Sequence, residues 1–157
     1  MKNKGIITKA LKEKPPVVFI TYASLVSFLT YSSMYAFRKP FSAATFDNVF
    51  FLGVHLKIWL VASQVVGYTL SKFLGIKIVS EMNSQKRGIS ILVLIGIAEF
   101  ALFLFGITPT PYRIIFMFFN GIPLGMIWGL VFAYLEGRKY TEILGTGLSI
   151  SFIFASG

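Results

Sequence analysis

The sequence predicts an all-α protein, a polytopic bundle of transmembrane helices, from two features of composition and one of pattern. Of its 157 residues, 55% are hydrophobic and 13% are charged, whereas a soluble domain carries about 25% charged residues. Its seventeen phenylalanines cannot all be buried in one small soluble core. Apolar runs also recur along the chain at lengths near the ~20 residues that a helix needs to span a bilayer.

Four apolar segments are predicted to be complete helices, and a fifth begins before the sequence ends. The first covers residues 17–37 with a continuation to about residue 46, the second covers 58–79, the third 89–107 and the fourth 114–135. The fifth begins near Ile143 and is cut at Gly157, which leaves it too short to span a bilayer as given. We therefore expect a basic tail over residues 1–16, transmembrane helices over residues 17–157, and further sequence beyond Gly157.

Basic residues predict the orientation of these helices, because loops that face the cytoplasm are enriched in Lys and Arg. The side that holds the N-terminus receives ten cations: Lys2, Lys4, Lys9, Lys12, Lys14, Lys77, Lys86, Arg87, Arg138 and Lys139. The opposite side receives four: Arg38, Lys39, Lys57 and Arg113. The N-terminus is therefore predicted to be cytoplasmic, in the cell (inner) membrane. Basic loops that face anionic lipid explain the net charge of +9 better than a nucleic-acid-binding surface does.

Composition also argues against an enzyme. The chain has no cysteine, which excludes disulfides, thiol nucleophiles and Cys-ligated metals. The single histidine, His55, cannot supply a multi-histidine metal site. Hydrolase signatures such as GxSxG and HExxH are absent from the sequence. We therefore expect neither a cofactor nor a metal.

A polar stripe follows the first predicted helix. Ser24, Ser27, Tyr31, Tyr35 and Arg38 are spaced by three, four, four and three residues, which places them on one helix face. Hydroxyl, phenol and guanidinium groups in a line fit the wall of a water-filled cavity, and the planar donors of arginine suit phosphate or carboxylate. The alternative is an interfacial belt, in which the cations extend to lipid headgroups.

The second segment carries a similar pattern. Gln64, Tyr68 and Lys72 recur every four residues, again on one face. Lys72 lies about fourteen residues, or roughly 21 Å, from the external end, past the midplane of a ~30 Å hydrocarbon core. A cation at this depth more often faces the protein interior than lipid, although extension to the cytoplasmic surface is the alternative. We predict that these three residues line a substrate site.

The third and fourth segments hold one acidic residue and a set of glycines. Glu99, in the middle of the third, is a candidate proton carrier or ion-pair partner, or a carboxyl held neutral by burial. Gly121, Gly125 and Gly129 form a doubled small-xxx-small repeat, for which helix packing is the favoured interpretation. Residues 108–111 read Thr-Pro-Thr-Pro and predict a tight turn between antiparallel neighbours.

The motifs of the first two helices resemble the major facilitator superfamily, and within it the organophosphate:phosphate antiporter branch. Residues 38–41 read Arg-Lys-Pro-Phe, similar to that branch's Arg-Lys-x-Phe, and Tyr31 and Tyr35 fall at its tyrosine positions. Residues 67–73 read Gly-Tyr-Thr-Leu-Ser-Lys-Phe, similar to its Gly-Phe/Leu-Ser-Lys-Phe. A glycine-rich fourth helix and a basic turn follow in the expected order.

The resemblance implies a fold and a set of roles. The chain would be helices one to five of an N-terminal six-helix half, with the missing C-terminal half of the same polypeptide as its partner. Arg38 would bind the substrate phosphate, together with an Arg in the second half of the molecule. Lys39 and Lys72, with Tyr31 and Tyr35, would line the same substrate-binding cavity. It also implies that the first helix continues past Pro40 to about residue 46, so that Arg38 lies well inside it rather than at its end.

Two cytoplasmic segments depart from the superfamily's pattern. Residues 75–87 read Gly-Ile-Lys-Ile-Val-Ser-Glu-Met-Asn-Ser-Gln-Lys-Arg, a degraded form of Gly-x-x-x-Asp-Arg-x-Gly-Arg-Arg with Glu in place of Asp. Residues 134–139, Tyr-Leu-Glu-Gly-Arg-Lys, are more similar to an uncharacterised bacterial branch, reminiscent of Bacteroidetes membrane proteins. The departures leave the substrate open.

Two functions fit these observations. The first is a secondary transporter that moves a small anionic solute by alternating access, and one version of this solute is phosphorylated. The second is a transporter-like membrane sensor or scaffold that binds a ligand without moving it. Flux that is lost in Arg38→Ala would favour the first, and signalling without flux would favour the second.

Overall fold

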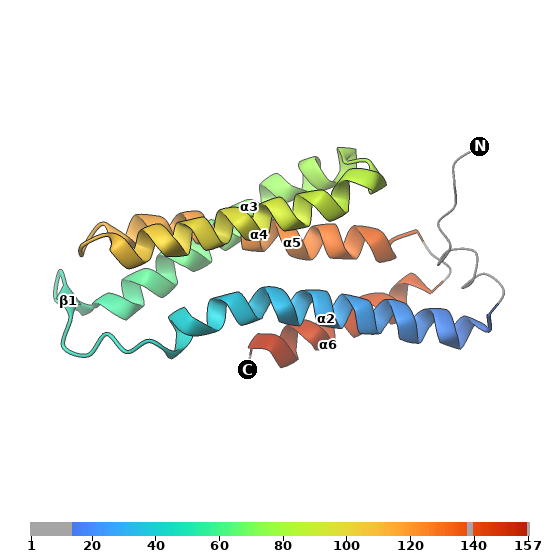
Figure 1. Cartoon of the computed structure of the whole chain (residues 1–157), viewed down its shortest axis with the longest axis horizontal. Coiled ribbons are helices and arrows are strands. Elements are labelled where there is room, and N and C mark those ends of the chain that lie inside the picture. The colour runs from blue at the N-terminus through green and yellow to red at the C-terminus, as the bar shows by residue number, and fades with distance from the viewer. Residues whose placement is uncertain (1–13, 138–139, 157) are drawn as a thin grey trace. The chain divides into compact units, whose positions relative to one another are not determined.

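The computed structural model describes residues 14–137 and 140–156, and within them the side chains of residues 37–40, 42, 84–85 and 155–156 lie outside the described part. The described residues form five helices: α2 (Pro16–Ala43), α3 (Leu56–Glu81), α4 (Ser84–Ile107), α5 (Arg113–Leu135) and α6 (Thr141–Ser156) (Figure 1). The all-α prediction is confirmed, and each helix covers a predicted apolar segment. The expected basic tail falls mostly outside the described residues.

Helix α2 continues to Ala43, so Arg38, Lys39 and Pro40 lie within its backbone. The expected continuation past Pro40 is therefore confirmed, although the helix ends three residues before Phe46. The side chains of Arg38 and Lys39 lie outside the described part of the chain, and so do residues Arg138 and Lys139.

Three of the described helical segments are long and apolar enough to cross a membrane: Pro16–Ala36, Lys86–Ile107 and Arg113–Leu135. Helix α3 has 26 residues but is less apolar, because Lys57, Gln64, Lys72 and Lys77 interrupt it. The segment Thr141–Phe154 of α6 is apolar but shorter. The chain is therefore a membrane protein by the length and composition of its helices.

The chain divides into two compact units. The two-helix unit contains α6 and the part of α2 that ends at Tyr35, and the three-helix unit runs from Ala36 to Tyr134. In the two-helix unit, the Phe152 ring of α6 lies 6.0 Å from the Tyr31 ring and 6.2 Å from the Tyr35 ring. Gly147 adds a close approach, since a Cβ there would lie 3.1 Å from Ser24 Oγ.

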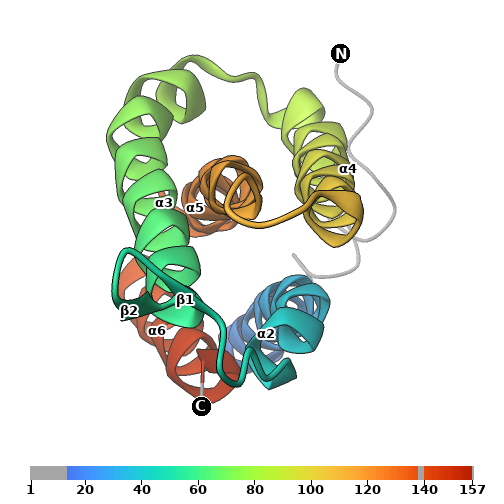
Figure 2. The same ribbon diagram turned by 90° about the vertical axis from the view of Figure 1, so that its left-hand side faces the viewer.

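In the three-helix unit, α5 lies between α3 and α4 (Figure 2). Asn120 of α5 donates a hydrogen bond of 3.0 Å to the Ala98 carbonyl of α4, and Arg87 near the start of α4 bonds the Ala133 carbonyl near the end of α5. These pairs run in opposite senses along the chain, so α4 and α5 are antiparallel, as the turn at residues 108–111 predicts. One end of the unit is closed by a core of Phe41, Leu56, Leu60 and Met117.

A short hairpin that the sequence pattern does not predict precedes α3. Strands β1 (Phe50–Phe51) and β2 (Val54–His55) pair antiparallel through a two-residue turn. Both turn residues, Leu52 at φ 51° and Gly53 at φ 76°, have positive φ, which is the type I′ geometry that matches strand twist. Trp59 Nε1 donates a 3.0 Å hydrogen bond to the Phe51 carbonyl and holds the hairpin against α3.

Candidate functional site

Helices α3 and α5 approach each other closely and run parallel. A Cβ at Gly67 would overlap the Phe118 carbonyl, a Cβ at Gly75 would lie 3.3 Å from Met126 Cγ, and a Cβ at Gly129 would lie 3.7 Å from Val79 Cγ2. The contacts advance along both helices together, which defines a parallel pair. Small residues permit such an approach because helix backbones can then meet without side chains between them.

Two glycines of α5 form the tightest part of this contact. A Cβ at Gly121 would lie 3.0 Å from the Tyr68 nitrogen and would overlap the Gln64 carbonyl. A Cβ at Gly125 would lie 2.5 Å from the Tyr68 carbonyl oxygen and would overlap Ser71 Oγ. Gly129 has no such conflict. Gly121 and Gly125 therefore sit where only glycine fits, and Gly129 does not.

Two buried amides connect the three helices beside these glycines. Gln64 Nε2 on α3 donates a 2.6 Å hydrogen bond to Asn120 Oδ1 on α5. Asn120 then donates to the Ala98 carbonyl on α4. Gln64 is 3% exposed and Asn120 is 1% exposed. Gln64 Oε1 is also buried, and it accepts no hydrogen bond from any described residue.

Lys72 lies on the flank of α3 rather than in the contact with α5. A residue four positions along a helix is rotated by about 40°, so two such steps from Gln64 turn Lys72 by about 80°. The buried side of α3 instead passes from Gln64 to Gly67, Ser71, Gly75 and Val79. Lys72 is exposed at its position, and its Nζ lies 4.7 Å from the centre of the Tyr68 ring. The two groups form a cation–π pair on one flank of the helix.

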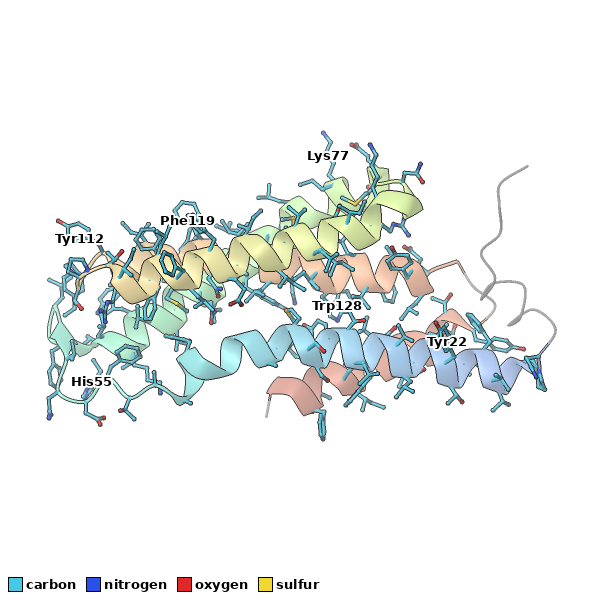
Figure 3. The ribbon with its side chains drawn as sticks, viewed as in Figure 1. Tyr22, His55, Lys77, Tyr112, Phe119 and Trp128 are labelled. Atoms are coloured by element: carbon cyan, nitrogen blue, oxygen red, sulfur yellow. The ribbon has the colours of Figure 1, made fainter. Side chains whose placement is uncertain are left out.

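A cavity of about 360 Å³ opens beside Lys72. Its lining comes from α3 and α5: Lys72, Gly75, Ile76, Val79, Gly125, Met126, Trp128, Gly129 and Phe132. Trp128 lies past the middle of α5 (Figure 3), and its ring stacks on Phe132 with centroids 5.3 Å apart and an interplanar angle of 4°. Lys72 is the one charged residue in this lining, and the other lining residues are apolar.

The remaining predicted residues fall in different places. Tyr31 and Tyr35 are buried in the two-helix unit, where they pack on each other at 5.5 Å and on Phe152. Glu99 is half-buried in α4, and its buried Oε1 accepts no hydrogen bond within the described part of the chain. Of the predicted residues, the structure thus brings Gln64 and Tyr68 against the glycines of α5, and Lys72 lies beside them at the cavity.

Two residues with clear roles were not predicted as part of a site. Asn120 of α5 joins α3 to α4, because it accepts a hydrogen bond from Gln64 and donates one to the Ala98 carbonyl. Arg87 was counted only for topology, yet it bonds the Ala133 carbonyl and lies 5.9 Å from the Tyr134 ring. An amide inside an apolar run, directly before Gly121, was the available signal for Asn120.

Comparison with known families gives one match. Residues 40–157 match a family of unknown function, DUF5690. The match therefore covers the last part of α2 and the whole of α3, α4, α5 and α6. No curated protein and no solved structure matches the chain.

Proposed function

The chain belongs to the DUF5690 family of unknown function, and we propose that it is a secondary transporter that carries a small anionic solute across the cell (inner) membrane by alternating access. The proposal includes a cytoplasmic N-terminus, which the distribution of basic residues supports. It also includes the major facilitator fold, which the motifs of residues 38–41 and 67–73 support.

The observation that carries the proposal is the depth of Lys72. Its neighbour Ser71 meets Gly125, and Gly125 lies near the midpoint of α5, a helix long and apolar enough to span the membrane. A cation near the middle of a bilayer is costly and is retained where it meets water or an anion. Lys72 borders a cavity at that level, which supports a role in binding an anion within the membrane.

The buried amides support the same proposal in a different way. Transport sites near the bilayer midplane combine charged groups with polar groups held by helix packing. Gln64 and Asn120 fix α3, α4 and α5 together near the middle of α5, one turn from Tyr68. Arg38 and Lys39 are proposed as the additional cations, on the strength of the family resemblance alone.

Uptake into proteoliposomes that hold the full-length protein, with the C-terminal half that the resemblance implies, tests the proposal. We expect uptake of at least one labelled anion from a panel of inorganic phosphate, glycerol 3-phosphate and short carboxylates. Lys72→Met and Arg38→Ala should each lower uptake about tenfold or more, because about 1.4 kcal/mol of lost binding is a tenfold change. Lys77→Met is the matched control, since Lys77 is exposed one and a half turns further along α3. Anion binding without flux would contradict transport and favour the sensor.

A further inference from the structure

The cavity between α3 and α5 has a polar end and an apolar end. Lys72 and Gly125 lie at one end, level with the middle of α5, and Val79 and Phe132 lie nearer the C-terminal ends of the two parallel helices. Gly125 is ten residues before Leu135, or about 15 Å at 1.5 Å per residue. The single charge of the cavity therefore lies deep, and the apolar part leads from it toward the membrane surface.

The walls of the cavity suit a flat or chain-like apolar group. Gly129 has no side chain, and a Cβ there would meet nothing closer than Val79 at 3.7 Å, so it leaves a trough between the helices, next to the closely packed Gly75 and Gly125. The stacked rings of Trp128 and Phe132 form a rigid wall on α5, and Ile76 and Val79 line α3. Purely polar anions such as inorganic phosphate would leave these walls without a partner. The volume of about 360 Å³ is at the lower end of the range for small-molecule sites.

We propose that this cavity binds an amphipathic anion, in which one carboxylate or phosphate is joined to an apolar group. The acid group binds the Lys72 ammonium, and the apolar group lies over Trp128 and Phe132. This inference rests on the proposed function, because it names the substrate class of the site that Lys72 borders, but binding can be measured without transport.

The direction of the cavity favours a solute over a phospholipid of the bilayer. A phospholipid keeps its headgroup at the membrane surface and its chains in the interior. The cavity has the reverse order, since its cation lies deep and its apolar walls extend toward the surface. A small amphipathic anion that enters with its acid group first meets both parts of the cavity in the correct order.

Fluorescence of Trp128 reports binding directly. The chain contains two tryptophans, and Trp59 lies at the hairpin, where it bonds the Phe51 carbonyl. In Trp59→Phe, Trp128 is the remaining tryptophan of residues 1–157 and lines the cavity, and excitation at a wavelength that tyrosine does not absorb isolates its emission. A twelve-carbon carboxylate with a terminal bromine, added to the protein in nanodiscs, should quench this emission saturably. The matching bromo-alcohol should bind at least about tenfold more weakly, because it lacks the charge that pairs with Lys72.

Two further variants separate the charge from the cavity. Lys72→Met should weaken quenching about tenfold, whereas Lys72→Arg should retain it within about threefold. Gly129→Leu should abolish it, because a Cβ at Gly129 meets Val79 at an ordinary 3.7 Å and the larger side chain then fills the trough. Unchanged melting temperatures show that these variants fold. If Lys72→Met does not fold, the alcohol and Gly129→Leu still decide the outcome.

The results distinguish this inference from the proposed function. Saturable, Lys72-dependent quenching without flux of any anion would support the binding site and contradict the proposed transport. Flux of glycerol 3-phosphate, without quenching of Trp128 by the bromo-carboxylate, would support transport and overturn the amphipathic-anion site. Equal quenching by alcohol and carboxylate would also overturn it. So would Lys72-dependent quenching by brominated phosphatidylglycerol that the carboxylate does not displace, since the occupant would then be a lipid.

Discussion

Gln64 of α3 donates a hydrogen bond of 2.6 Å to Asn120 of α5, and both side chains are almost fully buried. Asn120 extends the connection to the Ala98 carbonyl of α4. The pair therefore fixes three helices at one level, beside the backbones that Gly121 and Gly125 bring together. The polar network and the glycine contact stabilise each other, because the short amide–amide distance requires the close approach of α3 and α5.

Replacement of Asn120 by Leu should destabilise the protein. The substitution removes two hydrogen bonds and leaves the Gln64 amide buried without its acceptor, at a cost of about 1–3 kcal/mol. A lower melting temperature in detergent checks the expectation. The double variant Gln64→Leu with Asn120→Leu should lose less than the sum of the single variants, since neither helix then buries an unpaired amide. Additive losses would show that the two amides do not act together.

Gly125→Ala should destabilise the protein far more than Gly129→Ala. The new Cβ at Gly125 conflicts with the Tyr68 carbonyl and with Ser71 Oγ, so α3 and α5 must separate, at about 1–3 kcal/mol. At Gly129 the nearest atom is Val79 Cγ2 at 3.7 Å, and alanine's better helix propensity offsets any small repacking.

Thermal unfolding of both variants in detergent tests this difference. Gly96→Ala in α4 is the control, since a Cβ there meets no described atom within 4 Å. A loss at Gly129 equal to that at Gly125 would contradict the close approach at Gly125.

The sequence predicted the helices well because the apolar runs match the length that a bilayer requires. The continuation of α2 past Pro40 came from the resemblance, since hydropathy alone ends that helix near Arg38. The hairpin at Phe50–His55 was missed because two-residue strands leave no alternating pattern to detect. Its turn also uses Leu52 at positive φ, where the preferred residues would have been Asn, Asp or Gly.

The candidate site was predicted in part. Spacing of four placed Gln64 and Lys72 on one face, but the helix turns by about 80° between them. One is therefore buried against Asn120, and the other lies exposed at the cavity. Asn120 itself was missed because its partners lie on two other helices, and local spacing does not reveal them. The glycine repeat indicated close packing, but the sequence could not separate Gly125 from Gly129.

Phe152→Ala should loosen α6 from α2 within the two-helix unit. The Phe152 ring contacts both Tyr31 and Tyr35, and Tyr31 is fully buried. Removal of a packed aromatic ring costs about 3–5 kcal/mol in a soluble core. We expect faster hydrogen exchange in residues 141–156 than in the parent protein. Ile150→Ala is the control, because Ile150 is 58% exposed on the same helix. Equal exchange in the two variants would contradict the aromatic contact.

Arg87→Met should release the C-terminal end of α5. The last carbonyls of a helix have no partner within it, and Arg87 supplies a donor to the Ala133 carbonyl while its guanidinium lies 5.9 Å from the Tyr134 ring. Loss of a hydrogen bond from a charged donor costs about 1.5–3 kcal/mol, so the end of α5 should open more often. Hydrogen exchange of residues 131–135 should rise about tenfold, while that of residues 114–124 stays within about twofold.

Lys86→Met tests whether charge alone matters, since Lys86 is exposed beside Arg87. An equal rise in Lys86→Met would mean that the positive charge at this turn, and not the bond to Ala133, holds the helix end.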